Sequence, residues 1–297
     1  MIVLSAVTKQ FGDMIAVDNL NLEVAAGTIL GLVGTDGAGK TTTIRMITGV
    51  MDATSGSISL LGSEDVEAVK DQIGYVPQKF SLYGDLTVME NIRLIGRLYG
   101  VPVVEMEKKA AEILSFTELL PLKDRLADTL TGSMKQRLAL AAGLIHKPKV
   151  VFLDEPTTGF DPASRREFWQ MLYCLNKEDM TVFVSTPYMD EAEFCNRIAF
   201  MYSGKIIGCD IPQGLKKNYP HRLLELSVAN KDIKKILQGA PIRDINAFGA
   251  KYHLVVDEVE QARDWINLTL GKAGIAVVSL EEVAPTLDDV FVALVGG

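Results

Sequence analysis

The chain has 297 residues, of which 48% are hydrophobic and 23% are charged, and its formal net charge is −8. This length and composition suit one large globular domain, or one large and one small domain, with a core of ordinary size. The negative charge and the lack of Lys and Arg clusters argue against sequence-independent nucleic-acid binding, so we expect no nucleic-acid partner.

Three further features concern the place where the protein works. The three cysteines, Cys174, Cys195 and Cys209, are odd in number and lack the spacing of metal ligands, which favours reduced cytosolic thiols. The first twelve residues lack the basic start and apolar run of a signal peptide. No apolar stretch reaches the roughly 18 residues of a membrane-spanning helix. We therefore expect a cytoplasmic protein that reaches a membrane only by docking on a separate membrane protein.

Strands and helices are predicted to alternate in the first part of the chain. A strand at 29–33 leads directly into a glycine-rich loop and a helix at 41–48. From 87 to 145 the apolar residues follow a helical period. Further strands are predicted at 2–7, 16–24, 58–61, 73–76, 150–153, 181–185 and 198–201, and further helices at 134–146 and 165–175.

The composition changes near 215–220, which predicts a second domain. Its pattern indicates a small α+β domain over 218–297, following a first domain at 1–217 that includes a helical region at about 80–146. The expected strands of the second domain are 223–228, 243–248, 252–256 and 276–280, and the expected helices are 232–237, 261–273 and 287–294.

The segment from Gly34 to Thr41 fits the pattern G-x-x-x-x-G-K-[ST] between a strand and a helix. Glycines let backbone N–H groups approach phosphate oxygens without a Cβ in the way, and the helix N-terminus adds free donors. Lys40 is predicted to reach the β- and γ-phosphates of ATP, and the Thr41 hydroxyl to ligate Mg²⁺. The predicted nucleotide-binding residues of this loop are Gly34, Thr35, Asp36, Gly37, Ala38, Gly39, Lys40, Thr41 and Thr42.

The segment 150–155 is an apolar strand that ends in two acids, Asp154 and Glu155. Adjacent carboxylates at the end of a buried strand are costly without a cationic partner. We predict that Asp154 holds the Mg²⁺ shell and that Glu155 polarises the attacking water as general base. Gln78, which follows the predicted strand at 73–76, is a second catalytic candidate whose amide could bind Mg²⁺ or the water.

The sequence LTGSMKQ at 130–136 precedes a predicted helix with Thr131 as its N-cap. A helix that begins in this way presents backbone donors and a positive dipole end, which suits a phosphate held by another chain. An ordinary capped helix is the alternative when this segment is taken by itself.

The order of these motifs resembles that of ABC ATPases over about residues 1–215. The resemblance implies a P-loop NTPase fold, with a RecA-like α/β core, an antiparallel β subdomain and a helical subdomain. It also implies a head-to-tail dimer, in which a signature segment meets the ATP of the partner. On this basis Phe11 matches the aromatic residue that stacks on adenine, and Asp161 the acid that contacts the partner. The signature positions are Thr131, Gly132, Ser133, Met134 and Gln136.

Within that superfamily, the segments 162–169, 185–193 and 286–295 resemble the bacterial drug-export branch, whose membrane subunits are of the ABC-2 type. The likeness extends to the N-terminal half of tandem ATPase subunits of multidrug efflux systems. It implies membrane permease partners, a second and non-identical ATPase domain, and a position on the inner face of the cell membrane.

Three residues depart from the family pattern. The signature usually reads Leu-Ser-Gly-Gly, and here its second position is Thr131, which keeps a hydroxyl, and its fourth is Ser133. Pro187 stands where a switch histidine should follow Ser185-Thr186. Because proline cannot bind the γ-phosphate through its side chain, hydrolysis at this chain's own loop is expected to be slow. The principal interpretation is an ATPase subunit that drives solute export, and a regulatory half with little turnover is the alternative. A third interpretation, an ABC ATPase of translation or DNA repair, is disfavoured by the acidic charge.

Overall fold

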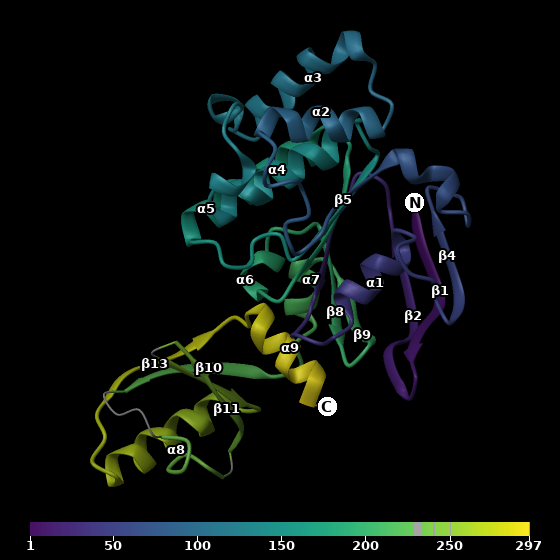
Figure 1. Cartoon of the computed structure of the whole chain (residues 1–297). Coiled ribbons are helices and arrows are strands. Elements are labelled where there is room, and N and C mark those ends of the chain that lie inside the picture. Colours follow the sequence, from purple (N-terminus) through teal and green to yellow (C-terminus); the bar gives the residue numbers. More distant parts are fainter. Residues whose placement is uncertain (229–232, 240, 250, 297) are drawn as a thin grey trace. The chain divides into compact units, whose positions relative to one another are not determined.

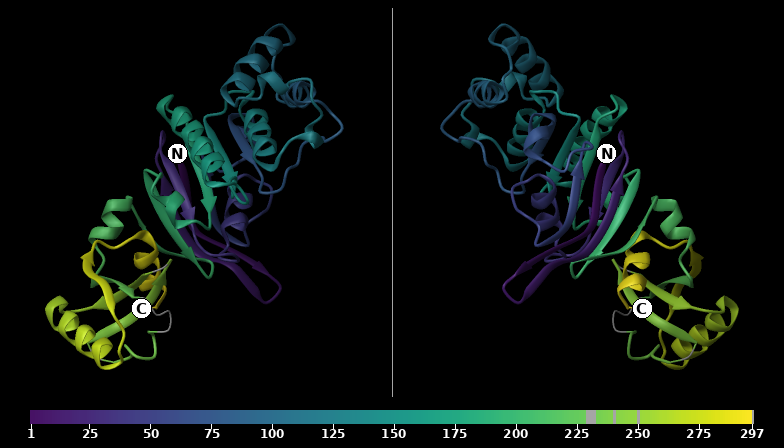
Figure 2. Two further views of the ribbon diagram at one scale, coloured as in Figure 1. Left: turned by 90° about the vertical axis from the view of Figure 1, so that its left-hand side faces the viewer. Right: turned by 90° about the vertical axis from the view of Figure 1, so that its right-hand side faces the viewer.

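The computed structural model describes residues 1–228, 233–239, 241–249 and 251–296. The chain forms two compact units, Met1–Pro212 and Gln213–Gly297, shown in Figures 1 and 2. Within the described residues, every helix is too short or too polar to cross a bilayer.

Two sheets and a helix between them form the core of the first unit. The smaller sheet is antiparallel, with the order β2-β1-β4. The larger sheet has the order β5-β6-β7-β3-β8-β9 and is parallel except for β9. Ile44 and Ile47 of α1 (Lys40–Ile47) are fully buried in a core that includes residues of both sheets. The strands are β1 (Ile2–Phe11), β2 (Met14–Val24), β3 (Ile29–Val33), β4 (Ser55–Leu60), β5 (Ile73–Val76), β6 (Val150–Asp154), β7 (Thr181–Thr186), β8 (Arg197–Tyr202) and β9 (Lys205–Asp210).

A group of helices with its own apolar core lies at one end of the larger sheet, in blue and teal in Figure 2. It contains α2 (Val88–Leu98), α3 (Val103–Phe116) and α4 (Gly132–Leu144), and α4 packs against β5. The first turn of α2 is fixed by Thr87 and Glu90, which form a capping box. Short 3₁₀ turns occur at η1 (Glu67–Gln72), η2 (Leu120–Leu122) and η3 (Ala127–Thr129).

The remaining helices of the chain's first part are α5 (Pro162–Lys177), α6 (Met189–Ala192) and α7 (Pro212–Lys217), the last of which begins at the boundary between the units. The α5 helix begins with Asp161 as N-cap and proline at its first position, an arrangement that suits the unpaired N–H groups of a first turn.

The register of the parallel strands brings three chain segments to one edge of the larger sheet. Val33 at the end of β3 pairs with Thr186 of β7, and Ser185 pairs with Asp154 at the end of β6. Because β7 lies between β3 and β6, the loops that follow all three strands emerge side by side. Ligands of open α/β sheets bind at this carboxyl edge.

The second unit contains an antiparallel sheet with the order β11-β12-β10-β13 and the helix α8 (Val259–Lys272). Ala262, Ile266 and Leu270 of α8 are fully buried against one face of the sheet. The strands are β10 (Arg222–Val228), β11 (Ile242–Phe248), β12 (Lys251–Val256) and β13 (Val277–Val283), and a last helix is α9 (Leu287–Gly296).

The prediction of a helix at 232–237 is wrong for residues 233–237, the part that the structure describes. Residue 232 lies outside the described residues, and 233–237 form a turn in which the Ile236 and Leu237 amides donate to the Ile233 carbonyl. Ile233 and Leu237 are both fully buried. These two apolar residues, four positions apart, do lie on one buried face, as the sequence pattern indicated. A single turn is enough to bury both of them, so no helix is needed.

Candidate functional site

The phosphate loop connects β3 to α1 and surrounds a buried lysine. The Lys40 side chain is only 3% exposed, and its ammonium donates to the carbonyls of Gly34 at 2.7 Å and Thr35 at 3.0 Å. It also forms an ion pair with the Glu155 carboxylate at 3.1 Å. A buried ammonium needs such partners, because its desolvation is otherwise strongly unfavourable. The loop therefore holds its lysine between carbonyls and a carboxylate.

Two glycines of this loop have no room for a side chain. A Cβ on Gly34 would lie 2.1 Å from the Met201 carbonyl oxygen. Gly39 has φ +107°, and a Cβ there would lie 2.5 Å from the carbonyl oxygen of Ala16. Both residues are thus required by close backbone approach, and at Gly39 also by a left-handed backbone.

The Asp154 carboxylate accepts hydrogen bonds from two hydroxyl groups. Its Oδ1 accepts from the Thr41 hydroxyl at 3.0 Å and from the Ser185 hydroxyl at 2.7 Å. The carboxylate is buried, with 1% of the residue exposed. Hydroxyl and carboxylate oxygens are the ligands that Mg²⁺ prefers, and Thr41 and Asp154 already touch each other. These residues therefore fit a magnesium ion that is also bound to phosphate oxygens.

Glu155 is held in an unusual backbone conformation. Its φ is +47°, which costs a non-glycine residue of the order of 1–3 kcal/mol and persists only where neighbours enforce it. Its amide donates to the carbonyl and hydroxyl oxygens of Ser185, at 3.1 and 3.0 Å. Its carboxylate binds Lys40 through Oε1, while Oε2 accepts from the Gln78 amide at 2.8 Å. Such local strain is common at functional sites.

The structure joins Gln78 both to Glu155 and to the helical subdomain. Its side chain reaches Glu155, and its backbone carbonyl accepts from the Gln136 amide at 3.1 Å. Gln136 is on the buried side of α4, and its own Oε1 is buried with no hydrogen-bond partner among the residues that the structure describes. The Gln136 amide thus binds a backbone carbonyl of its own chain. The sequence analysis had placed Gln136 among the signature residues, which are expected to meet the ATP of a partner.

The other signature residues lie at the N-terminus of α4. Thr131 is the N-cap, and its hydroxyl accepts from the Met134 amide at 3.3 Å. Thr131 and Gly132 are exposed, and the Ser133 hydroxyl lies 3.3 Å from that of Thr131. The start of α4 is therefore free to approach an anion.

Two further candidates lie outside the hydrogen-bonded cluster. Phe11 ends β1 and is 42% exposed, with the Lys9 ammonium 5.2 Å from its ring centre. Asp161 caps α5 by accepting from the amides of Ala163 and Ser164, both at 3.0 Å. These hydrogen bonds, led by that of the Ser164 hydroxyl, lower the pKa of Asp161. In the described part of the chain, no hydrogen bond joins Phe11, Thr131 or Asp161 to Lys40 or Glu155.

Sequence reasoning missed Ser185 as a site residue. Its hydroxyl donates to Asp154 and accepts from the Glu155 amide, so it fixes both acids at once. A polar residue directly after the apolar run 182–184 was the available signal. It also missed a buried carboxylate on α6, Glu191, that binds two threonines of neighbouring loops.

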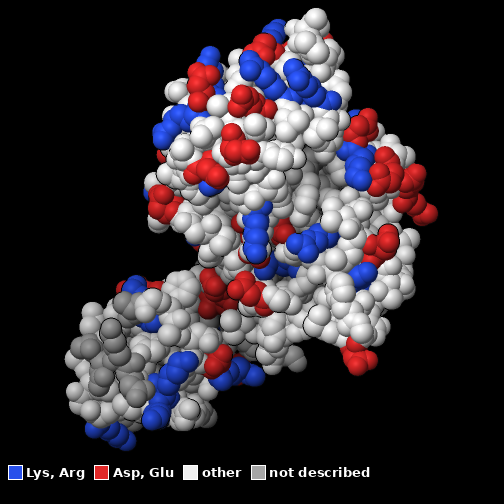
Figure 3. Space-filling model, in the orientation of Figure 1, with Lys and Arg blue, Asp and Glu red and all other residues white. Residues whose placement is uncertain are grey.

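Charged side chains of both signs surround the cluster. Figure 3 shows Lys and Arg side chains gathered between α1 and α6 on the face drawn in Figure 1, with Asp and Glu side chains among them. The basic side chains suit a polyphosphate.

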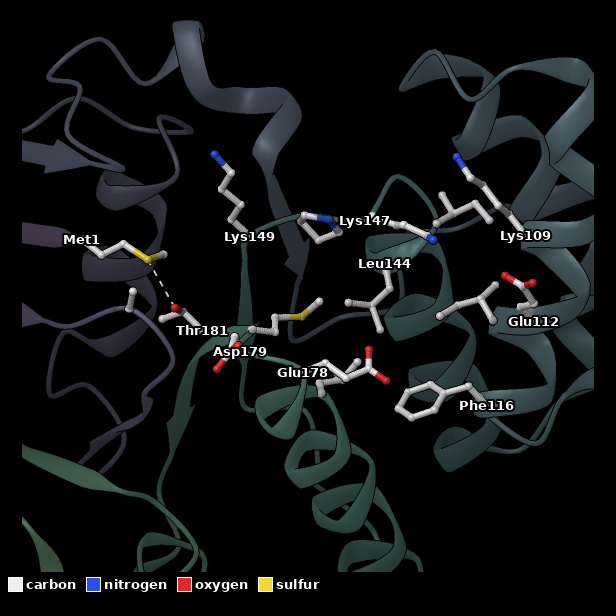
Figure 4. A pocket seen from close by; sticks show the side chains of 16 residues that line it. Met1, Lys109, Glu112, Phe116, Leu144, Lys147, Lys149, Glu178, Asp179 and Thr181 are labelled. Atoms are coloured by element: carbon white, nitrogen blue, oxygen red, sulfur yellow. Dashed lines mark hydrogen bonds between the residues drawn. The ribbon is translucent and has the colours of Figure 1, made fainter.

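A cavity of about 630 Å³ lies elsewhere, at the amino ends of β6 and β7, where Leu144, Met180 and Phe116 contribute apolar walls. In Figure 4, Lys109 and Lys147 lie on one side of this cavity, and Glu178 on the other. Because it opens at the opposite edge from the phosphate loop, it is not the nucleotide site.

Comparisons with known proteins agree with this geometry. Residues 17–158 match the family described as "ABC transporter", and residues 212–295 match the "ATP-binding protein DrrA1-3-like, C-terminal domain". The structure is similar to a dimeric post-hydrolysis state of the ATP-binding cassette MJ0796 bound to ADP and Pi. The TM-score is 0.66 at 28% identity, over 71% of this chain and 98% of that one.

Three curated relatives cover almost the whole chain. The probable multidrug ABC transporter ATP-binding protein YbhF of Escherichia coli is 37% identical over all of this chain but only 52% of its own length, so the chain spans about half of that relative. The Nod factor export ATP-binding protein I of Rhizobium sp. is 33% identical, over 99% of this chain and 96% of its own length. The daunorubicin resistance ATP-binding protein DrrA2 of Streptomyces coeruleorubidus is 33% identical, over 98% and 94%.

The phosphate loop, the two acids at the end of β6 and the helical subdomain thus occur in a fold that matches an ATP-binding cassette over 71% of the chain. The sequence matches ATP-binding proteins over almost all of the chain. This chain belongs to the family of ABC transporter ATP-binding proteins.

Proposed function

We propose that this chain binds and hydrolyses Mg-ATP to drive export of a drug-like or other small solute through separate membrane subunits. The observation that carries the proposal is the buried cluster at the carboxyl edge of the sheet. There, Lys40, Glu155 and Asp154 meet within hydrogen-bonding distance of the phosphate loop. The export role is supported by relatives whose names refer to multidrug transport, Nod factor export and daunorubicin resistance.

In the proposed reaction the loop amides and Lys40 bind the phosphates of ATP. Thr41, Asp154 and Gln78 would hold Mg²⁺, which neutralises charge on the phosphate oxygens. Glu155 then accepts the proton of the attacking water, and Gln78 orients that water or reports its presence to α4 through Gln136. Phe11 would stack on adenine.

The proposed assembly is a head-to-tail dimer with a second, non-identical ATPase domain on ABC-2 type permease subunits, at the inner face of the membrane. Support comes from the exposed N-terminus of α4, which offers donors at Thr131 and Gly132 to a phosphate of the partner. Asp161, exposed at the start of α5, would contact the partner. Gln78 and the segment 80–97 would transmit motion to the permease, and residues 218–297 would serve as an accessory domain.

A regulatory half that binds ATP but rarely hydrolyses it is the second candidate, and Pro187 favours it. Proline offers no side-chain donor to the γ-phosphate and no backbone N–H. The presence of a carboxylate at Glu155, next to Lys40 and Gln78, favours turnover instead. We propose slow hydrolysis at this chain's own loop rather than none.

The experiment is a comparison of ATP affinity with ATP turnover in the purified chain, with and without Mg²⁺. Turnover that requires Mg²⁺ and disappears in Glu155→Gln supports the ATPase. Tight ATP binding with no Glu155-dependent turnover supports the regulatory half instead. With the partner domain present, single-turnover rates at the two sites, with each catalytic acid removed in turn, test the asymmetry. Equal rates would refute it.

A further inference from the structure

The hydrolytic scheme leaves one fully buried carboxylate without a role. Glu191 lies on α6 with none of its surface exposed. One of its oxygens accepts from the Thr157 hydroxyl, and the other accepts from the Thr186 hydroxyl at 2.6 Å. A carboxylate in such a place is unfavourable unless it is fully hydrogen-bonded, so these contacts form a tightly constrained unit.

The two threonines belong to the two segments that flank the reaction centre. Thr157 follows Glu155 by two residues, in a turn where the Thr158 amide donates to the Glu155 carbonyl at 3.3 Å. Thr186 immediately precedes Pro187 and pairs with Val33, next to the phosphate loop. One carboxylate therefore bridges the turn of the catalytic acid and the end of β7.

A cation completes the unit. The Arg165 guanidinium pairs with Glu191 at 3.3 Å and with Asp190 at 3.2 Å, and it lies 4.2 Å from the ring centre of Tyr188. Burial raises the pKa of Glu191, while the hydroxyl hydrogen bonds of Thr157 and Thr186 and the charge of Arg165 oppose that rise. Arg165 is on the first turn of α5, so the start of this helix is fixed to the same carboxylate.

The turn that Glu191 contacts through Thr157 contains the strained backbone of Glu155. Glu155 keeps its positive φ only because its neighbours enforce it, and the Thr157–Glu191 hydrogen bond is one of those constraints. On the other side, the Thr186 hydroxyl donates to Glu191 and accepts from the Tyr188 amide at 3.1 Å, which fixes the chain on both sides of Pro187. The Pro187 side chain has no polar group that could position the water. The backbone around residues 155 and 187 therefore has to be held by other residues.

We propose that Glu191 is a positioning residue for ATP hydrolysis, which holds the Glu155 turn and the Thr186–Pro187 segment in one reactive arrangement. The proposal rests on the hydrolytic function proposed above. Because Glu191 touches neither the loop lysine nor Asp154, it acts on the rate of the chemical step and not on nucleotide binding.

The test compares Glu191→Gln with the wild-type chain, with Glu178→Gln as a matched control at an exposed position at the end of α5. Steady-state ATP hydrolysis and the affinity for a fluorescent, non-hydrolysable ATP analogue are measured at a temperature where each protein is folded by circular dichroism. A displacement of about 1 Å can lower a rate by up to about 100-fold. We expect kcat to fall about tenfold or more in Glu191→Gln, with KM and analogue affinity within about twofold and Glu178→Gln unchanged.

A second variant, Thr186→Val, removes one donor without changing the carboxylate. Thr186→Val should also lower kcat, and it serves as the test of the proposal if Glu191→Gln does not fold. A kcat within twofold of wild type in the folded variants, or equal losses of kcat and analogue affinity, would overturn the proposal for Glu191. Wild-type turnover that Glu155→Gln leaves intact would instead overturn the proposed hydrolytic function, and this inference with it.

Discussion

The ion pair between Lys40 and Glu155 leads to a prediction that can be tested on this chain alone, without its transport partners. Both side chains are buried, and the Lys40 ammonium lies 3.1 Å from the Glu155 carboxylate. Glu155→Gln keeps the shape of the side chain and removes its charge. We expect the variant to be less stable than wild type without nucleotide, and to be stabilised more strongly when nucleotide binds.

The magnitude follows from the contacts of Lys40. Two unit charges at 3.1 Å attract by about 5 kcal/mol at an effective dielectric constant of about 20. Loss of one partner of a buried pair costs about 3–5 kcal/mol, but the new amide oxygen and the Gly34 and Thr35 carbonyls still accept from Lys40. A net loss of about 2 kcal/mol is therefore expected. In a domain of about 200 residues this corresponds to a fall in melting temperature of about 4–8 °C.

Nucleotide should remove this deficit, because its phosphates supply the missing negative charge. The assay is thermal unfolding of wild type, Glu155→Gln and the control Glu178→Gln, with and without Mg²⁺ and a non-hydrolysable ATP analogue. The analogue should raise the melting temperature of Glu155→Gln by about 4–8 °C more than that of wild type, and should bind it up to about 30-fold more tightly. Equal melting temperatures without nucleotide, or equal increases with it, would show that the carboxylate does not hold Lys40.

Three other predictions concern the loop, the adenine platform and the thiols. Gly34→Ala should weaken ATP binding more than tenfold in a fluorescence titration, because its Cβ would lie 2.1 Å from a carbonyl oxygen; unchanged affinity would contradict this close approach. Phe11→Ala should weaken ATP affinity by about 1–3 kcal/mol if the ring stacks on adenine, and an equal loss for inorganic triphosphate would argue against stacking. Burial raises the pKa of the Cys195 thiol, so in native protein a thiol reagent should modify exposed Cys174 and spare Cys195 until unfolding. The contribution of this thiol to stability is fully present below the unfolded pKa of 9.0 and falls as the pH rises above it.

The elements that sequence predicted best are those bounded by unambiguous signals. The strands at 29–33 and 73–76 have the expected bounds, because each is an apolar run that ends at a turn or loop. The strand β9 was not predicted, although Ser203 and Gly204 both have positive φ, as a two-residue hairpin turn requires. Its half-buried, mixed sequence lacks a clear alternation, so only the pairing with β8 establishes it.

The composition of the site was accessible from sequence, but its connections were not. The motifs identified Lys40, Asp154 and Glu155 because each residue type is tied to a chemical need. The order of strands in the sheet decides which loops are neighbours, and no local pattern encodes that order. Contacts such as Gln78 to Glu155, separated by 77 positions, and Thr157 to Glu191, separated by 34, therefore came only from the folded chain.

We propose that the same lysine connects ATP binding to hydrolysis. Both oxygens of the Glu155 carboxylate are bound, one by Lys40 and the other by the Gln78 amide, whereas a general base needs a free oxygen to accept a proton from water. Phosphates that bind Lys40 would release one of these oxygens at the moment a substrate is present. Glu155 would then be available as the proposed general base. Pro187 changes neither contact of Glu155, and for this reason we expect its effect to be on the rate of hydrolysis rather than on the binding of ATP.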